Sequence, residues 1–173
     1  MKKYVLIASI LLLLAGCSAS VSVAKESNVY QTQVQPTVKH LDSFKVTRNT
    51  IQMNKVIKYL KTRVGKTSYV FAGASPRGWD CSGLVRWAYE RFGIELPHSA
   101  DKQGHVGIRV SKPKIGDIVV FAYPGSTHFY HAAIYIGNGK IINAHYGAHS
   151  TIIQPLTDYK HSQIRFVRVV DTK

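Results

Sequence analysis

Residues 131–145, which read HAAIYIGNGKIINAH, constrain the fold more than any other stretch of the chain. Alternating apolar residues flank the GNG triplet at 137–139, and this pattern predicts a β-hairpin. A two-residue loop at the last two positions of the triplet would place the two apolar sets on opposite faces. A three-residue loop would instead pair Ile134 with Ile142 and bring both sets to one face, so we predict that register.

The same register pairs Ile136 with Lys140 and gives the hairpin a second, more polar face. His131 and His145 would lie directly opposite each other on this face, with Asn143 diagonal to His131. Facing residues in an antiparallel pair are about 5 Å apart at Cβ. The pattern therefore predicts an imidazole beside two side chains that could hydrogen bond to it.

Helical periodicity precedes the hairpin, and strand periodicity surrounds it. Apolar side chains recur on one helical face in residues 49–64, with Asn49 or Thr50 as the expected cap, and again in residues 82–92. Strands are predicted at 117–122, 131–136, 140–145, 150–154 and 164–169. Helices followed by a meander of short strands are typical of an α+β fold with an antiparallel sheet.

The N-terminus has the pattern of an export signal. Two lysines precede an apolar run at 4–15 that is too short to span a membrane as a mature helix. Residues 14–17 (LAGC) resemble the lipobox of bacterial lipoproteins, in which the cysteine is diacylated and becomes the new N-terminus; an ordinary secretory signal is the alternative. The expected organisation is a signal peptide at 1–16, a lipidated Cys17 with a flexible tether over 17–48, and one domain at 49–173.

The lipobox resemblance also implies a cellular location. Ser18, rather than Asp, follows the cysteine. In a cell with two membranes this implies an anchor in the outer membrane, facing the periplasm. In a cell with one membrane the protein would lie on the outer face of the plasma membrane.

Cys81 is one of only two cysteines in the chain. If Cys17 carries acyl chains, no disulfide can form within the chain and Cys81 is a single free thiol. It lies in the Gly-, Pro- and Ser-containing stretch 69–83, directly before an apolar helical pattern. Because a helix N-terminus favours negative charge, we expect this thiol to be biased towards thiolate.

Cys81 and His131 together provide the groups of thiol–imidazole catalysis. Cys81 is the expected nucleophile, and His131 the general base that later returns the proton to the leaving amine. The backbone N–H of Cys81, at a helix start, is a candidate oxyanion donor. A metal site made of Cys81, His131 and His145 would lack the close-set ligand pairs of zinc motifs, so no metal and no cofactor are expected.

The net charge of +14 favours polyanionic partners. Loss of the first 16 residues would remove Lys2 and Lys3 and no acidic residue, which leaves +12. An exported chain rarely meets nucleic acid, so peptidoglycan carboxylates, anionic envelope polymers and anionic lipid head groups are the expected partners. Solubility alone is the other interpretation of this charge.

Residues 49–169 resemble the NlpC family of cell-wall cysteine peptidases, which have a papain-like fold of N-terminal helices on an antiparallel sheet of about five to six strands. The motifs that carry the resemblance are Asp80-Cys81-Ser82-Gly83-Leu84-Val85, Tyr69, Leu96-Pro97-His98-Ser99, Gly116-Asp117-Ile118-Val119, and His131 with the GNG turn. The family implies hydrolysis of the amide between D-glutamate and the diamino acid of peptidoglycan stem peptides.

The resemblance also implies roles for neighbouring residues. Tyr69 matches an active-site tyrosine, and Asp80 and Ser82 match residues that bind the amino end of the stem peptide in some members. The third catalytic position falls on Asn143, where close relatives often have histidine. His145, on the same face, is the alternative orienter of His131.

Two other functions remain open from the sequence. A papain-like amidase or acyl transferase would use the same thiol and imidazole on a different substrate. A non-catalytic wall-binding lipoprotein would not need Cys81 and His131, both of which are present.

Overall fold

The computed structural model describes residues 38–173, so the predicted signal peptide, Cys17 and most of the predicted tether lie outside the described residues. The helices are α1 (Val38–Thr62), α2 (Cys81–Glu90), α3 (Ala100–Gln103) and the 3₁₀ helix η1 (Leu156–Tyr159). The strands are β1 (Ala74–Ser75), β2 (Gly78–Trp79), β3 (Ile108–Val110), β4 (Ile118–Ala122), β5 (Phe129–Gly137), β6 (Lys140–His145), β7 (Ser150–Pro155) and β8 (Gln163–Arg168).

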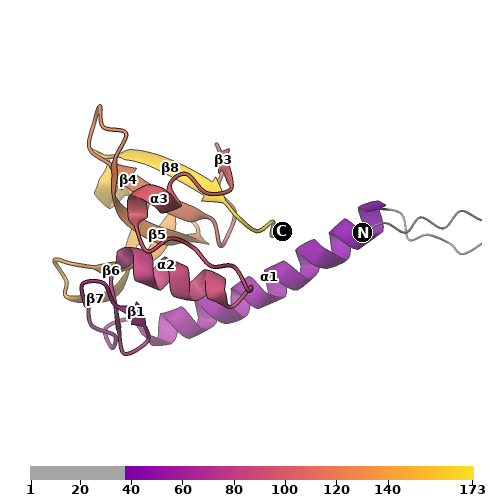
Figure 1. Ribbon diagram of the computed structural model, residues 1–173, viewed down its shortest axis with the longest axis horizontal. Coiled ribbons are helices and arrows are strands. Elements are labelled where there is room, and N and C mark those ends of the chain that lie inside the picture. The colour runs from indigo at the N-terminus through magenta and orange to yellow at the C-terminus, as the bar shows by residue number, and fades with distance from the viewer. Residues whose placement is uncertain (1–37) are drawn as a thin grey trace, which may run out of the picture. The chain divides into compact units, whose positions relative to one another are not determined.

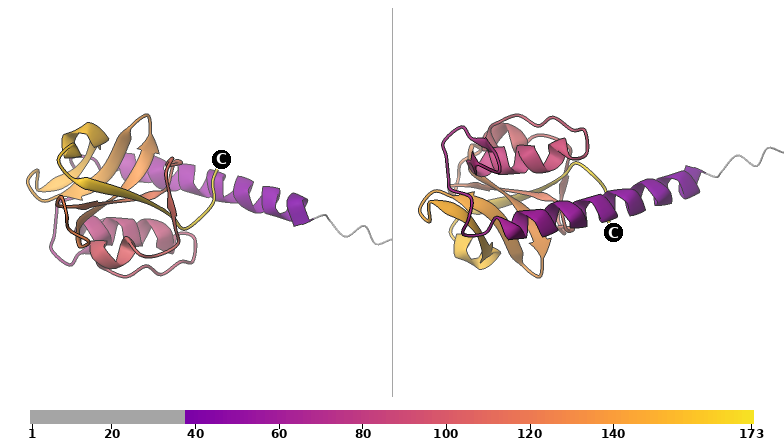
Figure 2. Two further views of the ribbon diagram at one scale, coloured as in Figure 1. Left: turned by 90° about the horizontal axis from the view of Figure 1, so that it is seen from above. Right: turned by 90° about the horizontal axis from the view of Figure 1, so that it is seen from below.

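Six of these strands form one antiparallel sheet in the order β3-β8-β4-β5-β6-β7 (Figure 1). β1 and β2 form a separate small hairpin just ahead of α2. α2 packs against β5 and β6, on the opposite side of the sheet from η1 (Figure 2). This architecture confirms the predicted α+β class with an antiparallel sheet.

Both faces of the sheet are covered, and β4 shows the consequence. All five residues of β4 are buried. Val120 belongs to the main core, together with Leu84 of α2 and Leu60 of α1, whereas Phe121 belongs to a smaller core on the other face, against which Tyr159 packs. A strand buried on both faces needs apolar residues at every position, which explains the unbroken run in this segment.

α1 begins at Val38, ahead of the start predicted at residue 49. Residues 38–48 contain no Gly or Pro that would stop a helix, so the residues predicted to end the tether are helical instead. Met53, Val56, Ile57 and Leu60 of the predicted core face are buried, whereas Ile51, predicted on the same face, is exposed. Among residues 38–173, no helix is long and apolar enough to cross a membrane.

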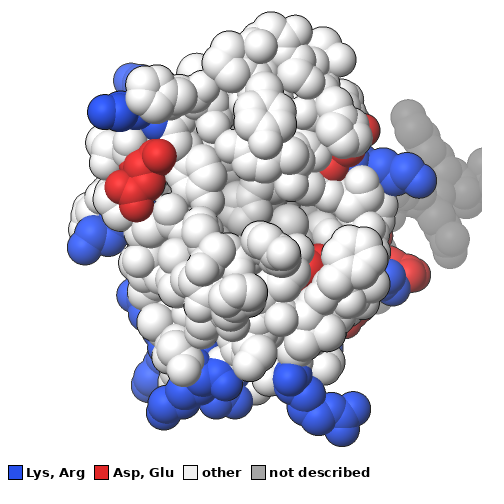
Figure 3. All heavy atoms as spheres, turned by 90° about the vertical axis from the view of Figure 1, so that its left-hand side faces the viewer, with Lys and Arg blue, Asp and Glu red and all other residues white. Residues whose placement is uncertain are grey.

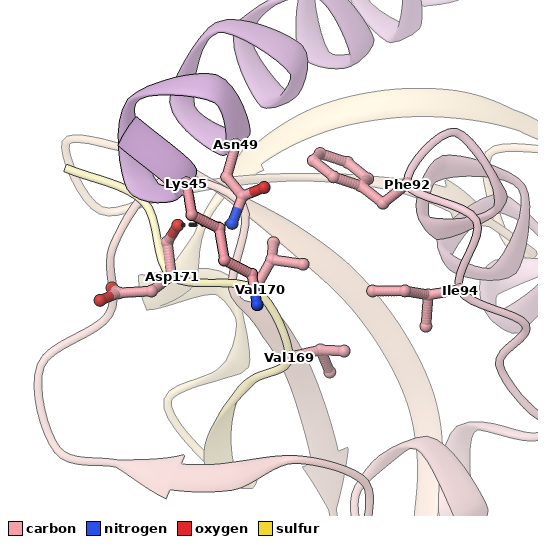
Figure 4. A pocket seen from close by; sticks show the side chains of 7 residues that line it. All are labelled: Lys45, Asn49, Phe92, Ile94, Val169, Val170 and Asp171. Atoms are coloured by element: carbon pink, nitrogen blue, oxygen red, sulfur yellow. Dashed lines mark hydrogen bonds between the residues drawn. The ribbon is translucent and has the colours of Figure 1, made fainter. Parts of the chain in front are cut away.

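The C-terminal tail packs beside the first half of α1 (Figure 4). Asn49 does not cap the helix as expected, because it lies within α1 and its Nδ2 donates to the carbonyl of Asp171 at 3.1 Å. The backbone N–H of Lys173 donates to Thr50 Oγ1 at 2.9 Å. The hollow between the tail and the helix contains neither Cys81 nor any histidine; it is lined by Lys45, Asn49, Phe92, Ile94, Val169, Val170 and Asp171.

The hairpin reaches the predicted register by a different route. Gly137 pairs with Lys140, so the turn has two residues, Asn138 and Gly139, both at positive φ. The predicted three-residue loop and the pairing of residue 136 with residue 140 are therefore wrong, because Asn-Gly is strongly suited to a two-residue type I′ turn. An irregularity between residues 135 and 137 adds one residue to β5 and restores the predicted pairing of residue 134 with residue 142.

The elements that were not predicted are all short. β1, β2 and β3 have two or three residues each, and α3 has four. Such lengths are too brief to show helical or strand periodicity. They nevertheless contribute to the site, because β1 and β2 shape the loop that leads to Cys81.

Candidate active site

Cys81 is the first residue of α2, where the apolar pattern placed it. Asp80 caps the helix, with Oδ1 accepting from the Gly83 N–H at 2.7 Å and from Ser82 Oγ at 3.0 Å. Its other oxygen, Oδ2, accepts from the Ala72 N–H at 3.0 Å. One buried carboxylate therefore ties the preceding loop to the helix that presents the thiol.

His131 lies on β5, on the face of the sheet that carries the smaller core. It is buried, and its ring lies over Tyr159 at 5.7 Å between centroids and near Phe121 at 5.6 Å. Its Nε2 lies 3.0 Å from Asn143 Oδ1. Because that carbonyl oxygen can only accept, Nε2 carries the proton and Nδ1 is left unprotonated.

Asn143, rather than His145, contacts His131. The rings of the two histidines are 6.3 Å apart at their centroids, and Nδ1 of His145 accepts instead from the Ala148 N–H at 3.0 Å. Asn143 is fully buried, and its Nδ2 donates to Gln154 Oε1 at 3.1 Å. Of the two predicted neighbours, the structure therefore brings only Asn143 into hydrogen-bonding distance.

Burial keeps both reactive groups neutral. Desolvation lowers the pKa of His131 to about 4, against a smaller opposite effect of its bond to Asn143. Desolvation also raises the pKa of Cys81, although the nearby backbone N–H groups of Ala132 and Ser82 favour the thiolate. The expected bias of Cys81 towards thiolate is therefore wrong for this structure, because burial outweighs the helix N-terminus.

The Cys81 thiol lies close to the residue that follows His131 on β5, since the Ala132 N–H acts on it. Within the described residues, however, no hydrogen bond joins Cys81 to His131. Such contacts commonly form only when substrate binds. Tyr69 is half-buried near Cys81 and Asp80, and desolvation by this burial is the main cause that raises the pKa of its hydroxyl.

Cys81 opens into a cleft between the loop before α2, the start of α3 and the start of β5. Its lining consists of Tyr69, Phe71, Ala72, Asp80, Cys81, Ser82, His98, Ser99, Ala100, Asp101, His128, Phe129 and Tyr130. Figure 3 shows the face of the molecule at which α2 begins; uncharged side chains form most of its hollowed middle, and Lys and Arg lie towards its edges.

His98 is the cleft residue whose role sequence reasoning missed. Its Nε2 lies 2.9 Å from Asp80 Oδ1, so it forms a hydrogen bond with the carboxylate that caps α2. A side chain at position 83 would collide with Gly73 and with His98, which shows how tightly the two loops pack at the thiol. The segment Leu96-Pro97-His98-Ser99 was identified as a motif, but sequence distance gave no sign of its contact with Asp80.

Residues 38–173 contain no group of three or more His, Cys, Asp or Glu side chains that could hold a metal ion. The site thus consists of a thiol, an imidazole with a fixed tautomer, an amide and a carboxylate. A thiol and an imidazole in this relation are suited to acyl transfer through a covalent thioester.

The family comparison agrees with this arrangement. Residues 65–170 match the model of the NlpC/P60 family, and residues 1–18 match that of the prokaryotic membrane lipoprotein lipid attachment site. The family match covers more than half of the chain, so the protein belongs to the NlpC/P60 family, whose solved members share its papain-like fold.

Individual relatives are similar over part of the chain. A gamma-DL-glutamyl hydrolase of Bacillus subtilis is 40% identical over 107 residues, which cover 60% of this chain and 26% of that protein. A probable endopeptidase of Mycobacterium tuberculosis is 41% identical over 91 residues, covering 51% of this chain and 22% of the other. The chain therefore matches only about a quarter of the length of these curated relatives.

Among solved structures, an NlpC/P60 family protein from Bacillus cereus superposes with a TM-score of 0.62 at 30% identity. The superposition covers 68% of this chain and 40% of the other.

Proposed function

We propose that this protein is a peptidoglycan hydrolase that cleaves stem peptides at the amide between D-glutamate and the diamino acid. The observation that carries the proposal is the buried hydrogen bond from His131 Nε2 to Asn143 Oδ1 at 3.0 Å, which leaves Nδ1 free to act as a base. The relative named gamma-DL-glutamyl hydrolase supports a bond made by a glutamyl residue.

The reaction begins when the Cys81 sulfur attacks the scissile carbonyl carbon while its proton moves to His131 Nδ1. The backbone N–H of Cys81, in the first turn of α2 where N–H groups have no partner within the helix, stabilises the oxyanion. The C–N bond then breaks, and the leaving amine takes the proton from Nδ1. Water hydrolyses the thioester by the same steps, which releases the carboxylic acid and restores the thiol.

Asn143 orients the ring of His131 in this scheme and adds no charge. The imidazolium that forms during attack is therefore stabilised less than it would be by a carboxylate. Because the Asn143 amide also has a partner in Gln154, its direction is held by a second hydrogen bond.

Asp80 and Ser82 are proposed to bind the amino end of the stem peptide. Oδ1 of Asp80 already accepts from Ser82, Gly83 and His98, whereas Oδ2 accepts only from the Ala72 N–H. The remaining acceptor position on Oδ2 suits an ammonium group. Tyr69, which shares this end of the cleft, is the proposed neighbour of the bound peptide.

The match to a lipid attachment site supports a cell-envelope protein held on a membrane through Cys17. The proposed substrate, peptidoglycan, lies in the same compartment. An anchor in the outer membrane facing the periplasm follows from Ser18 in a cell with two membranes, and an anchor on the outer face of the plasma membrane in a cell with one.

The test is digestion of purified peptidoglycan with residues 18–173, followed by mass spectrometry of the fragments. New fragments that end in D-glutamate, absent with Cys81→Ala, are the expected result. Fragments that end elsewhere would change the bond, and release of a fatty acid or another amide product would favour an amidase or acyl transferase. No fragments, with retention of the protein on the insoluble wall, would favour a non-catalytic binding protein.

A further inference from the structure

The hydrogen bonds of Asn143 continue away from His131 through two more side chains. Asn143 Nδ2 donates to Gln154 Oε1 at 3.1 Å, and Gln154 Nε2 donates to Asp158 Oδ2 at 3.4 Å. Asn143 lies on β6, Gln154 on the neighbouring β7, and Asp158 in η1 directly after β7. Four side chains from four consecutive elements are therefore joined in one chain of hydrogen bonds, which runs from His131 to Asp158.

The carboxylate at the end of this chain of hydrogen bonds gives it a direction. An amide can be placed either way round, but a carboxylate only accepts hydrogen bonds. At 3.4 Å and on the exposed surface, Asp158 favours the NH₂ group of Gln154 on its side, which turns Oε1 towards Asn143. Asn143 must then present Nδ2 to Gln154 and its oxygen to His131, and this requires a proton on Nε2.

We propose that Gln154 is a positioning residue, which transmits the direction set by Asp158 and holds His131 in the tautomer that has Nδ1 free for the thiol proton. The inference deepens the proposed hydrolase function and rests on it for its catalytic meaning. The tautomer itself is a property of the resting protein and can be measured without substrate.

Burial explains why a positioning residue is needed. Asn143 is fully buried, so water cannot correct a reversed amide. A reversed Asn143 would donate Nδ2 to Nε2 of His131 and move the ring proton to Nδ1. The base would then be blocked although all catalytic residues were still present.

Two substitutions at position 154 distinguish a role of Gln154 in orienting Asn143 from a role in packing alone. Gln154→Met keeps the length of the side chain and removes its acceptor, whereas Gln154→Glu keeps an acceptor for Asn143 Nδ2. Gln163→Met on β8 is the matched control, because Gln163 is an exposed strand glutamine with no hydrogen bond to the site. The readouts are ¹⁵N NMR of His131, assigned by comparison with His131→Gln, and kcat and KM on a stem peptide.

We expect the Nε2–H tautomer in the unaltered protein, in Gln154→Glu and in Gln163→Met, and a mixture of tautomers in Gln154→Met. In the same Met variant, kcat should fall about tenfold with KM within twofold. An unchanged tautomer in Gln154→Met, or equal losses in the Met and Glu variants, would overturn the inference. If the unaltered protein shows the Nε2–H form but cleaves no stem peptide, the proposed function fails and the positioning role stands.

A different observation, the distribution of charge, carries a second inference. Residues 45–66 contain seven Lys or Arg and no Asp or Glu. Six of these cations are exposed and form no ion pair within the described residues; they are Lys45, Arg48, Lys55, Lys58, Lys61 and Lys66. Figure 3 shows Lys and Arg gathered at the lower edge of its face, at the level where Figure 1 has the end of α1.

The helix itself presents most of these cations away from the core. Arg48, Lys55 and Lys58 are seven and ten residues apart, which is about two and three helical turns, so they share one face. Met53 and Leu60 are buried on a different face. This cationic face of α1 is close in sequence to the anchor, since only the 20 residues 18–37 separate Cys17 from the helix.

We infer that the cationic face of α1 docks on the anionic phospholipid surface to which the N-terminus is attached. Cations close to a charged membrane are attracted over about one Debye length, roughly 8 Å at physiological salt. A lipid anchor and a cationic patch together hold a protein more firmly than either alone.

The test is co-sedimentation of a protein of residues 18–173, which carries no acyl chains, with lipid vesicles. One set of vesicles contains phosphatidylglycerol and phosphatidylcholine, and the other contains phosphatidylcholine alone. One variant carries Arg48→Glu, Lys55→Glu and Lys58→Glu. The matched control carries Arg109→Glu, Lys112→Glu and Lys140→Glu, which are exposed outside α1 and change the net charge equally.

The α1 variant should lose at least tenfold in affinity for the anionic vesicles, and the control less than threefold. Equal losses would mean that net charge alone governs binding, and would overturn a dedicated face. Binding that is stronger to a soluble anionic polymer such as polyglutamate than to vesicles would overturn the lipid as partner. Circular dichroism and a thermal unfolding curve of each variant check that the fold is unchanged.

Discussion

The two halves of the proposed active site, the base half around His131 and the nucleophile half around Cys81, are held in different ways. His131 and Asn143 lie on paired strands, are buried, and are fixed by strand register and by aromatic packing. Cys81 lies where a loop becomes a helix, beside an open cleft. Asp80 accepts four of the hydrogen bonds that hold this second half together.

This difference separates two requirements of the chemistry. The base needs a fixed tautomer and a set pKa, and both can be provided by packing that the substrate never touches. The nucleophile must remain accessible, so its surroundings cannot be filled by a core. A single buried carboxylate is then a compact way to keep a loop in place without covering the thiol.

The largest loss of activity is expected when the nucleophile is replaced. Cys81→Ala should reduce cleavage of stem peptides by at least about 10³-fold, because no other thiol is present in residues 18–173. Mass spectrometry of digested peptidoglycan measures this. Folding should be unaffected, since the thiol makes no hydrogen bond to His131; residual cleavage above one-tenth of normal would contradict Cys81 as the nucleophile.

The next largest effect is expected in the base half. Asn143→Ala should lower kcat about 10²-fold because the ring of His131 loses its fixed tautomer. His145→Ala should change kcat less than threefold, because its ring is 6.3 Å from that of His131 and makes no hydrogen bond to it. Steady-state kinetics of both variants decide between them, and equal losses would contradict Asn143 as the orienter.

A third prediction concerns pH. The pKa of His131 is about 4, well below the ordinary value of 6.5, so the ring stays neutral and competent between these two values. Activity at pH 5.5 should therefore be close to that at pH 7, and should fall only as the pH approaches about 4. The profile of kcat/KM against pH measures this.

The variant Tyr159→Ala tests whether burial is the cause of the low pKa of His131. Tyr159 packs on the ring of His131, so its loss should admit water, relieve the desolvation and move the acid limb of the profile upward, towards 6.5. The matched change Tyr123→Ala, at an exposed ring that does not contact His131, should leave the limb in place. An acid limb near 6.5 in the unaltered protein would contradict burial as the controlling factor.

The smallest effect is expected when Asp80, which holds the loop before α2 to that helix, is replaced. Asp80→Ala should remove the side-chain cap of α2 and the bond to His98, with a loss of roughly 1 kcal/mol in the free energy of unfolding. If Asp80 also binds the amino end of the peptide, KM should rise more than kcat falls. Urea unfolding measures the first effect and kinetics the second.

The base half could be predicted from sequence because strand alternation is a local pattern with one solution. Ile134 pairs with Ile142 as predicted, although the turn has two residues and the extra residue lies in the irregularity at the end of β5. The apolar faces determined the register, and the turn chemistry determined only how it was reached.

The nucleophile half was predictable only in part. The helix pattern placed Cys81 at the start of α2. The bond from His98 to Asp80 joins loops 18 residues apart, and no periodicity encodes such a contact. The charge state of Cys81 was predicted wrongly because it depends on how deeply the thiol is buried, which only the packed structure reveals.

The raised pKa of Cys81 has a consequence for the lifetime of the protein. Oxidants and disulfides react with the thiolate rather than with the thiol. In the oxidising cell envelope, a permanently ionised cysteine would be converted to sulfenic acid or to a mixed disulfide. A partly buried, protonated Cys81 that loses its proton only during attack is therefore less reactive towards oxidants between turnovers.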